Sequence, residues 1–361
     1  MFTNSPSLPN STQSEQLETN DDLGNTHENE TNEELEEQDS LLSLPQKPIV
    51  NHVMTRDIPS GIFTSILDYF KRFGSTEFEH IVSILPLPEA DIYHYHRPHL
   101  EEKLLPNSVC TVHHDLDDPD PWHAKFRFIP RYMEASAIVC LNNTQKEILA
   151  NQGIPHEKLY VIPHGYHDGY LHLKQLSLPD TDKKITIGMA SRRYGRRVKG
   201  EAYLLELAKR LSPEHFRFIF VGQSRTLSTI AMRDLGYEAI AYERIPYRIF
   251  QSFYNEIDIL MMCSSHEGGP ANTPEALATG TPMFSSKIGI PKDVISDRIN
   301  GLFLSLDPDK DAENILDICV QNRHKLHEMI RNARNTSRLA ITWEDSILNN
   351  IAVYKKILSL S

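Results

Sequence analysis

The chain has 361 residues, of which 37 are Lys or Arg and 49 are Asp or Glu, and its formal net charge is −12. Eleven acidic residues and no Lys or Arg lie in residues 1–46, so residues 47–361 carry 38 acidic and 37 basic side chains. This balance excludes a basic nucleic-acid-binding protein and a strongly acidic one that recruits a basic partner. Residues 47–361 are numerous enough for two domains with cores of their own.

Residues 1–46 form a polar, acidic segment at the start of the chain. They are rich in Asn, Ser, Thr and Glu, and Phe2 is their only aromatic residue. Such a segment cannot bury enough apolar surface to offset its conformational entropy, so we predict a disordered acidic tail.

The sequence predicts a cytoplasmic protein. It has no apolar run long enough to span a membrane, and its N-terminus lacks the basic and apolar stretches of a secretory signal. The cysteines are widely spaced, and we expect buried free thiols in a reducing compartment at Cys110, Cys140, Cys263 and Cys319.

The ordered part is predicted to begin with a strand at residues 47–53, and strands and helices then alternate. The hydrophobic pattern predicts helices over 62–73 and 144–151, and strands over 78–85, 92–96, 109–113, 137–141 and 159–162. A second series begins at Lys184, with strands over 185–190, 216–221, 239–243, 257–263 and 282–285, and helices over 201–211, 274–279, 311–335 and 343–358.

This alternation predicts an α/β fold with parallel sheets that helices cover on both faces. Two such series, divided near 165–183, indicate two doubly wound Rossmann-like domains. Ligands bind beyond the carboxyl ends of the strands in open α/β sheets, so the loops that follow the strands are the candidate functional segments.

The loop after the strand at 257–263 contains two adjacent glycines. Gly268 and Gly269 let the backbone approach a ligand closely, and free amide groups there can receive an anion. Thr273 is suited to cap the following helix, and Pro274 to its first position.

The same loop carries two glutamates, Glu267 and Glu275, separated by seven residues. We expect both carboxylates to face one cleft. The alternative is a capped helix with a solvated Glu267, which is the more usual meaning of an arbitrary pair of glutamates.

The loop at 191–200 is cationic, with Arg192, Arg193, Arg196, Arg197 and Lys199. A nucleic-acid patch is one interpretation, but the near-neutral balance of the ordered part argues against it. A diphosphate fits better, because Arg offers bidentate geometry, Lys a point charge, and the helix that begins near Gly200 its dipole. Solvation is the simpler interpretation of Arg196 and Arg197.

Histidines gather in the first series. His94 and His96 share one face of a predicted strand, where they are more often core or cleft-lining residues than ligands. Imidazoles and the Asp115-x-Asp117 pair could hold zinc or manganese. We favour no metal site, because so short a motif needs a structural context that a loop after this strand does not supply.

The Glu267-x7-Glu275 spacing resembles family-4 retaining glycosyltransferases, which have the two-domain GT-B fold. The resemblance extends over much of 47–361, through the runs 137–143, 153–159, 161–165, 257–259, 289–291, 300–302 and 342–344. It implies two Rossmann-like domains that face each other across a cleft. The acceptor-side domain would be 47–172, joined by the C-terminal helix 343–361, and the nucleotide-sugar domain would be 173–342.

The resemblance also implies roles for residues of the second domain. Glu267 would contact the transferred sugar and Glu275 the ribose of the donor. Lys199 and Arg193, with Arg192 as the second match, would bind the leaving diphosphate. The backbone that contacts the sugar and diphosphate would be that of Gly269, Pro270, Ala271, Asn272 and Thr273.

In the first domain, the resemblance places His113 beside the sugar. His114 or His123 would face the acceptor. The family's loop after the first strand is usually richer in glycine, and Gly61 is the glycine retained here as a contact to the diphosphate.

The implied activity is retaining transfer of a sugar from a nucleotide diphosphate sugar to an acceptor hydroxyl. A UDP-sugar is the default donor, the acceptor is a glycan, a lipid-linked saccharide or a small molecule, and no metal or other cofactor is implied. Many relatives work at the inner face of the membrane, which leaves peripheral membrane association open. The alternatives are a GT-B phosphorylase, a sugar-nucleotide epimerase, or a catalytically silent binding subunit.

Overall fold

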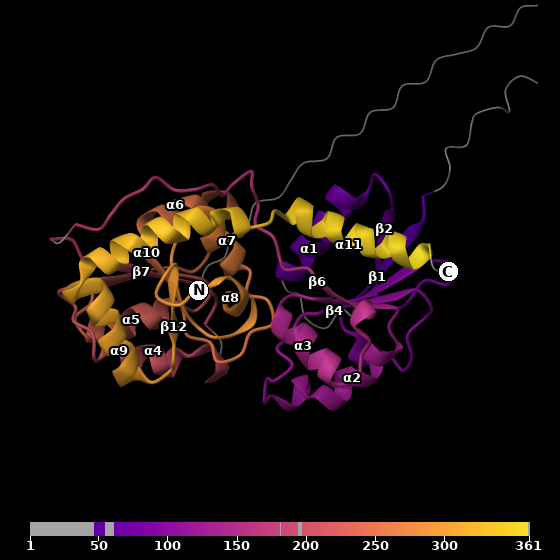
Figure 1. Ribbon diagram of the computed structural model, residues 1–361, viewed down its shortest axis with the longest axis horizontal. Helices are drawn as coiled ribbons and strands as arrows, with labels where there is room; N and C mark the ends of the chain where they lie inside the picture. Colours follow the sequence, from indigo (N-terminus) through magenta and orange to yellow (C-terminus); the bar gives the residue numbers. More distant parts are fainter. Residues whose placement is uncertain (1–46, 55–60, 181, 194–196, 360–361) are drawn as a thin grey trace, which may run out of the picture. The chain divides into compact units, whose positions relative to one another are not determined.

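The computed structural model describes residues 47–54, 61–180, 182–193 and 197–359 (Figure 1). The predicted tail at 1–46 and most of the loop at 55–62 lie outside the described residues. The four cysteines are buried and free, as predicted. Among the helices of the described part, none is both long enough and apolar enough to cross a bilayer.

The first sheet has six parallel strands in the order β2-β1-β3-β4-β5-β6. Its strands are β1 (Ile49–Val53), β2 (Glu79–Ser83), β3 (Ile92–Tyr95), β4 (Ser108–Val112), β5 (Ala137–Cys140) and β6 (Leu159–Val161). Strands β3, β4 and β5 are buried along their whole length, which is typical of parallel strands that are covered on both faces.

Helices cover both faces of this sheet. On one face, α1 (Gly61–Gly74) and α11 (Trp343–Leu358) pack with Val50, Val109 and Val139 into one apolar cluster (Figure 1). On the other face, α2 (Lys125–Glu134) and α3 (Asn143–Asn151) pack on Cys110 and Ile138. The last helix of the chain therefore completes the core of its first sheet.

The second sheet is also parallel, in the order β12-β11-β10-β7-β8-β9. Its strands are β7 (Ile185–Ala190), β8 (Phe216–Val221), β9 (Ala239–Tyr242), β10 (Ile259–Met262), β11 (Met283–Ser286) and β12 (Gly301–Leu304). The two sheets confirm the predicted α/β class.

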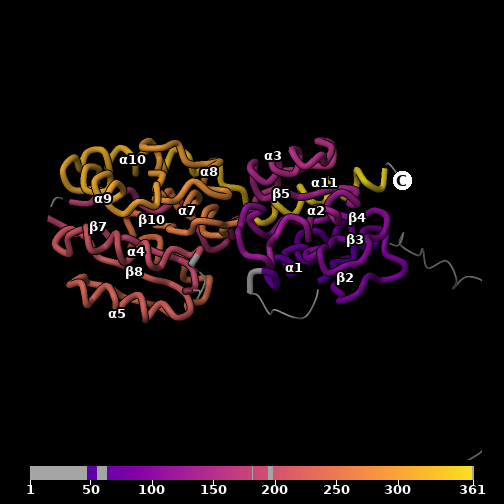
Figure 2. Tube along the Cα trace, turned by 90° about the horizontal axis from the view of Figure 1, so that it is seen from below, coloured from indigo at the N-terminus to yellow at the C-terminus, as the bar shows by residue number. Residues whose placement is uncertain are grey.

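Seven helices of this half have the bounds α4 (Glu201–Ala208), α5 (Thr226–Asp234), α6 (Phe250–Glu256), α7 (Asn272–Thr279), α8 (Gly289–Val294), α9 (Pro308–Leu316) and α10 (Arg323–Thr336). Leu204, Ile315 and Leu326 carry α4, α9 and α10 onto one core, and Figure 2 shows α9 and α10 close together. Phe253 and Leu277 carry α6 and α7 onto the core of the opposite face.

In each sheet the order of the strands reverses next to the strand that comes first in sequence. The switch lies between β1 and β3 in the first sheet, and between β7 and β10 in the second. The loops that leave neighbouring strands at such a point diverge and open a crevice at their carboxyl ends.

Two sequence predictions are wrong in detail. The single helix predicted over 311–335 is broken at Asn322, whose φ of −125° and ψ of 58° are not helical, after a π-helical turn at Asp317–Gln321. Thr273 does not cap α7, because that helix already begins at Asn272 and Ala271 is its N-cap residue, without a side-chain cap.

Candidate active site

A cavity of about 350 Å³ opens where β7 and β10 end, at the switch point of the second sheet. Its walls combine the loop after β7, the loop after β10, and side chains that the first half of the chain supplies. The residues that line it include Phe63, His113, His164, Ser191, Arg192, Lys199, Ser264, Glu267, Gly269, Pro270, Ala271 and Asn272. A cavity of this size and position suits a small-molecule ligand.

An ion pair between Lys199 and Glu267 lies in the wall of this cavity. Lys199 Nζ is 2.5 Å from Glu267 Oε1, and Ser264 Oγ donates a hydrogen bond of 2.8 Å to the same oxygen. The two side chains are only 16% and 18% exposed, so the charges are partly shielded from water. The pair therefore holds one cation and one carboxylate at fixed positions beside the space that a ligand would fill.

Gly200 allows the two loops that carry Lys199 and Glu267 to come into close contact. It precedes α4 with a φ of 77°, and a Cβ atom on it would lie 2.1 Å from the carbonyl oxygen of Cys263 at the end of β10. The neighbouring Val198 carbonyl accepts a hydrogen bond of 2.8 Å from the Ser265 amide. The loops after β7 and β10 are thus in direct backbone contact.

Substitution of Gly200 is expected to destabilise the protein by more than the strain of a left-handed backbone conformation alone would. Gly153 is the matched control, because its φ is 88° and nothing lies within 4 Å of an added Cβ. We expect Gly153→Ala to lower the free energy of unfolding by about 1 kcal/mol, and Gly200→Ala by about 2 kcal/mol more, since the neighbouring backbone must shift. Denaturant titration of both variants measures the difference, and equal losses would contradict the role given to the contact with Cys263.

Arg225 supports the loop after β7 through hydrogen bonds, a role that the sequence did not predict. Its side chain is 1% exposed, its Nε donates to the Ser191 carbonyl, and its Nη2 donates to Ser191 Oγ, both at 2.7 Å. Burial lowers the pKa of this guanidinium from its usual value. An arginine after a strand ordinarily signals a solvated loop, so the sequence held no sign of this role.

The loop before α7 reaches the first half of the chain. Asn142 Nδ2 donates a hydrogen bond of 2.7 Å to the Gly268 carbonyl. A Cβ atom on Gly268 would lie 2.6 Å from the carbonyl oxygen of His113. The close backbone approach expected of this glycine is therefore present, although its neighbour there is protein backbone. Thr273 is wholly buried, and the structure does not place it in the cavity wall.

Glu275 lines a neighbouring cavity of about 400 Å³, together with Tyr69, Tyr247 and Trp343. Ala271 lines both cavities, so the two glutamates open on adjoining spaces. The Tyr254 hydroxyl donates a hydrogen bond of 2.8 Å to Glu275 Oε2. Burial raises the pKa of Glu275 to about 7, although the tyrosine hydroxyls that donate to it act in the opposite direction.

The arginines predicted to bind the diphosphate do not all lie in the wall of the first cavity. Arg192 lines the first cavity, whereas Arg193 is exposed and holds its place through a backbone hydrogen bond of 2.9 Å to Gln223. Arg196 lies outside the described residues. Gly61 is the first residue of α1, and its contact with a diphosphate stays a prediction.

His113 lines the first cavity, and its contact with a sugar stays a prediction, whereas the two histidines assigned to the acceptor form a cluster of their own. The rings of His114 and His123 are stacked 5.3 Å apart, and His114 also packs on Phe128 at 3.9 Å. His123 Nδ1 is 2.9 Å from Asp118 Oδ2. Their role toward an acceptor stays a prediction.

Comparisons with known proteins bear on this architecture. Residues 174–336 match the family model described as glycosyl transferases group 1. Sucrose-phosphate synthase from Thermosynechococcus elongatus is similar in structure, with a TM-score of 0.68, 14% identity, and coverage of 87% of this chain and 100% of that one. HepE from Anabaena in complex with UDP-glucose has a TM-score of 0.65, 14% identity, and coverage of 84% and 99%.

A glycosyltransferase from Rickettsia africae is similar over 87% of this chain and 100% of its own, with 18% identity and a TM-score of 0.65. The fold is that of a GT-B glycosyltransferase. None of the curated proteins compared with the chain matches it. Within this GT-B architecture, the part matched by the family model contains Lys199, Glu267 and Glu275, whereas His113 belongs to the other half.

Proposed function

We propose that this GT-B protein transfers a sugar from a nucleotide diphosphate sugar to an acceptor hydroxyl with retention of the anomeric configuration. The observation that carries the proposal is the Lys199–Glu267 pair in a cavity at the β7/β10 switch point. A UDP-sugar is the proposed donor, in keeping with the UDP-glucose bound to the Anabaena HepE. The proposed acceptor is a glycan, a lipid-linked saccharide or a small molecule, and no metal ion takes part.

Charge stabilisation is the main contribution that this site can make. The bond to the leaving diphosphate breaks as negative charge builds on its oxygens and positive charge on the sugar ring. Lys199, Arg192 and the backbone N–H groups of Gly269, Ala271 and Asn272 lie around one cavity, where charges and dipoles stabilise such a leaving group. Arg193 is proposed to join them when the donor is bound.

Glu267 and His113 are proposed to hold the sugar between the two halves of the chain. Lys199 is already neutralised by Glu267 in the protein alone. An incoming diphosphate competes for the ammonium group, which frees the carboxylate to accept hydrogen bonds from sugar hydroxyls. When the donor binds, Lys199 and Glu267 therefore give up their contact with each other. Lys199 then contacts the diphosphate and Glu267 the sugar.

Glu275 is proposed to accept hydrogen bonds from the ribose, and this makes donor binding depend on pH. With a pKa of about 7, the carboxyl group is mostly ionised at pH 8 and mostly protonated at pH 6. We expect the affinity for the UDP-sugar to fall about tenfold over this interval, because the ionised group is the better acceptor. Calorimetric titration at both pH values measures this.

The matched variant is Glu275→Gln, in which the pH dependence is expected to disappear while binding is weak throughout. A UDP-sugar is the suitable probe, since its diphosphate diester does not titrate in this interval. Affinity that is constant from pH 8 to pH 6 in the unchanged protein would contradict the role of Glu275.

A screen of UDP-, GDP- and ADP-sugars for donor hydrolysis tests the proposed function most directly. Turnover of one donor, followed by NMR of the anomeric proton of a transferred product, supports retaining transfer. Release of a free sugar phosphate that depends on phosphate indicates a phosphorylase, and a change of the sugar within the nucleotide indicates an epimerase. Binding of a nucleotide sugar without any turnover indicates a silent binding subunit.

A further inference from the structure

A small cavity of about 20 Å³ lies between α11 and the first sheet, next to the first cavity. The two cavities share Ile66, His113 and His164 in their walls. We call the small one the inner cavity. Its two polar residues on α11, Ser346 and Asn350, are buried. A water molecule needs about 10–15 Å³ of such space, so the inner cavity has room for one.

Two buried side chains in this wall have polar atoms without a hydrogen bond. Among the described residues, neither ring nitrogen of His164 has a partner, and Oδ1 of Asn350 has none either. His164 is 8% exposed and Asn350 is 5% exposed. Unpartnered groups of this kind are rare in a protein interior, because each one has lost its hydrogen bonds to water on folding. Both side chains line the inner cavity, which is therefore where a partner belongs.

The orientation of the Asn350 amide is set by α11. Its Nδ2 donates a hydrogen bond of 2.8 Å to the carbonyl oxygen of Ser346, one turn earlier in the helix. The opposite orientation of the amide would place Oδ1 against that carbonyl, where the two oxygens repel each other. Oδ1 is thus an acceptor that requires a donor from elsewhere.

The loop that carries His164 is joined to the start of α11. Ser346 Oγ donates a hydrogen bond of 2.9 Å to the Pro163 carbonyl, and the Trp343 amide donates one of 2.9 Å to the Tyr166 carbonyl. The ring of Trp343 packs on that of His164, with centroids 5.3 Å apart. The last helix therefore positions the loop that brings His164 into the wall of the first cavity.

Water is the ligand that satisfies both side chains at once. Burial lowers the pKa of His164 to about 4, so its imidazole is neutral, with one N–H donor and one acceptor nitrogen. The Gly269 backbone is close enough to oppose this effect, but it lacks the geometry of a hydrogen bond to the ring. A water molecule can donate to Asn350 Oδ1 and can either donate to or accept from a ring nitrogen. It therefore fits whichever nitrogen of His164 carries the proton.

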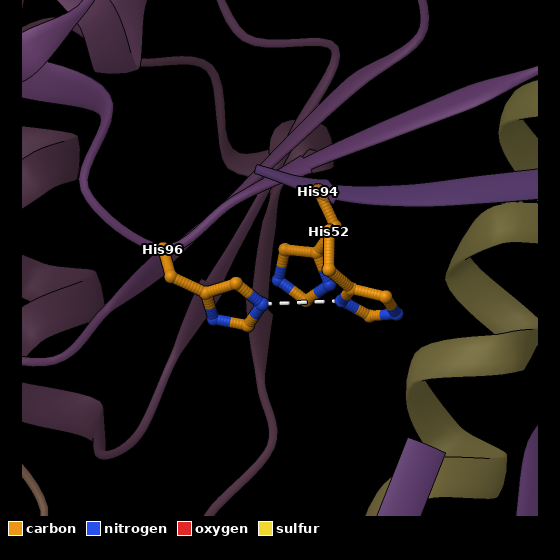
Figure 3. A group of neighbouring side chains, drawn as sticks. All are labelled: His52, His94 and His96. Carbon is orange, nitrogen blue, oxygen red and sulfur yellow. Dashed lines mark hydrogen bonds between the residues drawn. The ribbon is translucent and has the colours of Figure 1, made fainter. Parts of the chain in front are cut away.

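A metal ion is the competing occupant, since His96 lines the inner cavity and forms a cluster with His52 and His94. Figure 3 shows the ring of His94 beside the hydrogen bond of 3.1 Å that joins His52 and His96. The other nitrogen of His96 is 3.0 Å from His113, and His94 bonds hydroxyl groups through both of its nitrogens, at 2.6 and 2.7 Å. The rings of His94 and His96 are also stacked, with centroids 4.4 Å apart, so their lone pairs do not point at one place. The unpartnered atoms of the inner cavity suit water better than a metal ion.

We propose that the inner cavity binds one water molecule between Asn350 and His164, and that Asn350 is a positioning residue that holds the His164 ring through this water at the wall of the first cavity. Asn350 does not itself line the first cavity, so its effect on a ligand there passes through the ring. A ring that is held before the ligand arrives loses less freedom on binding it. The identity of that ligand, a nucleotide sugar, rests on the proposed function, whereas the water site does not.

A crystal structure of the full chain without nucleotide tests the water site independently of activity. We expect one ordered water within hydrogen-bond distance of Asn350 Oδ1 and of a ring nitrogen of His164. We expect it to be lost in Asn350→Leu, which has nearly the same shape but no acceptor oxygen. An inner cavity without water, in a structure that orders water elsewhere in the interior, overturns the inference whether or not the variant folds. A metal ion at this place, identified by its anomalous scattering, also overturns it.

Kinetics with the donor found in the screen test the positioning role. Asn350→Leu is expected to raise KM for the donor about tenfold, as the loss of one hydrogen bond would, and to leave kcat within about twofold. Asn350→Thr is the conservative variant, because its hydroxyl can donate to the Ser346 carbonyl and accept a hydrogen bond from water. It is expected to keep both the water and KM. Asn349→Leu, at the exposed neighbouring position of the same helix, is the matched control and is expected to change neither.

The outcomes separate this inference from the proposed function. If the water is present but no donor is turned over, the proposed function fails and the water site stands. If transfer occurs and the inner cavity holds no water, this inference fails and the proposed function stands. A KM in Asn350→Leu equal to that of the unchanged protein refutes the positioning role of Asn350.

Discussion

Lys199→Ala is expected to lower the turnover of the donor by about 100-fold or more, and Glu267→Ala by a similar factor. Lys199 contributes a fixed positive charge where the diphosphate leaves, and Glu267 a carboxylate beside the sugar. The pair is only 2.5 Å apart and mostly shielded from water, so each variant also leaves the other charge without its partner. Steady-state kinetics at saturating donor measure the loss in kcat.

The chain offers a matched control pair on α4 and its end. Lys209 Nζ lies 2.6 Å from Glu206 Oε1, but both side chains are nearly half exposed. Lys209→Ala removes the same charge from the same half of the molecule and is expected to leave turnover within about twofold, since exposed pairs contribute little. Rates close to those of the unchanged protein in both Lys199→Ala and Glu267→Ala would contradict the assignment of the active site.

A double variant separates direct roles from the loss of the pair. If the two residues act on one transition state, Lys199→Ala combined with Glu267→Ala should lose far less than the product of the two single effects. Losses that multiply would instead indicate two independent contributions.

The free energy of unfolding is expected to fall steeply as the pH decreases from 7 to 5. The cause is the group of buried histidines His52, His80, His94, His96 and His113, whose pKa values burial holds below the usual value near 6.5. The folded protein keeps them neutral, while the unfolded chain binds protons below pH 6.5, so acid favours unfolding. At pH 5 this amounts to about 2 kcal/mol for each of His80 and His96.

Denaturant titrations at pH 7.5, 6 and 5 measure this slope. His96→Asn removes one titrating group and should flatten the slope, whereas replacement of the exposed His215 by Asn should leave it unchanged. Glu275 acts in the opposite direction, because its raised pKa lets the folded protein hold an extra proton between about pH 4.5 and pH 7, but it is a single group. Stability that is level from pH 7 to pH 5 would refute the buried, neutral state of the cluster.

The prediction from sequence was accurate where one apolar stripe runs the whole length of a helix. The last helix has the bounds 343–358 that its stripe predicted, and in the structure Thr342 and Asp345 form a capping box at its start. The prediction of a single helix over 311–335 was wrong because the apolar pattern continues across the break at Asn322. The helix α2 was missed, since Pro130 lies inside it and reads locally as a breaker.

The candidate site was predictable to the extent that it depends on loops after strands. Lys199 and Glu267 follow two strands that turn out to be neighbours at a switch point, and the structure brings them together. The contact of Arg225 with Ser191 was not predictable, and neither was the row of hydrogen bonds that runs from His80 through His52 and His96 to His113. Both depend on which strands are adjacent, and residues from four strands form a row only once the order of the sheet is known.

The position of α11 has a consequence for how the chain is made. Trp343, Ile347 and Tyr354 fill the core beneath β1 and β4, yet they are synthesised after every strand of the two sheets. The first sheet, although synthesised early, must therefore wait with part of one apolar face uncovered until residues 343–358 have been made. Chaperones that bind exposed apolar surface have their longest opportunity there, and a premature stop codon near residue 340 would damage the oldest part of the nascent protein more than the newest.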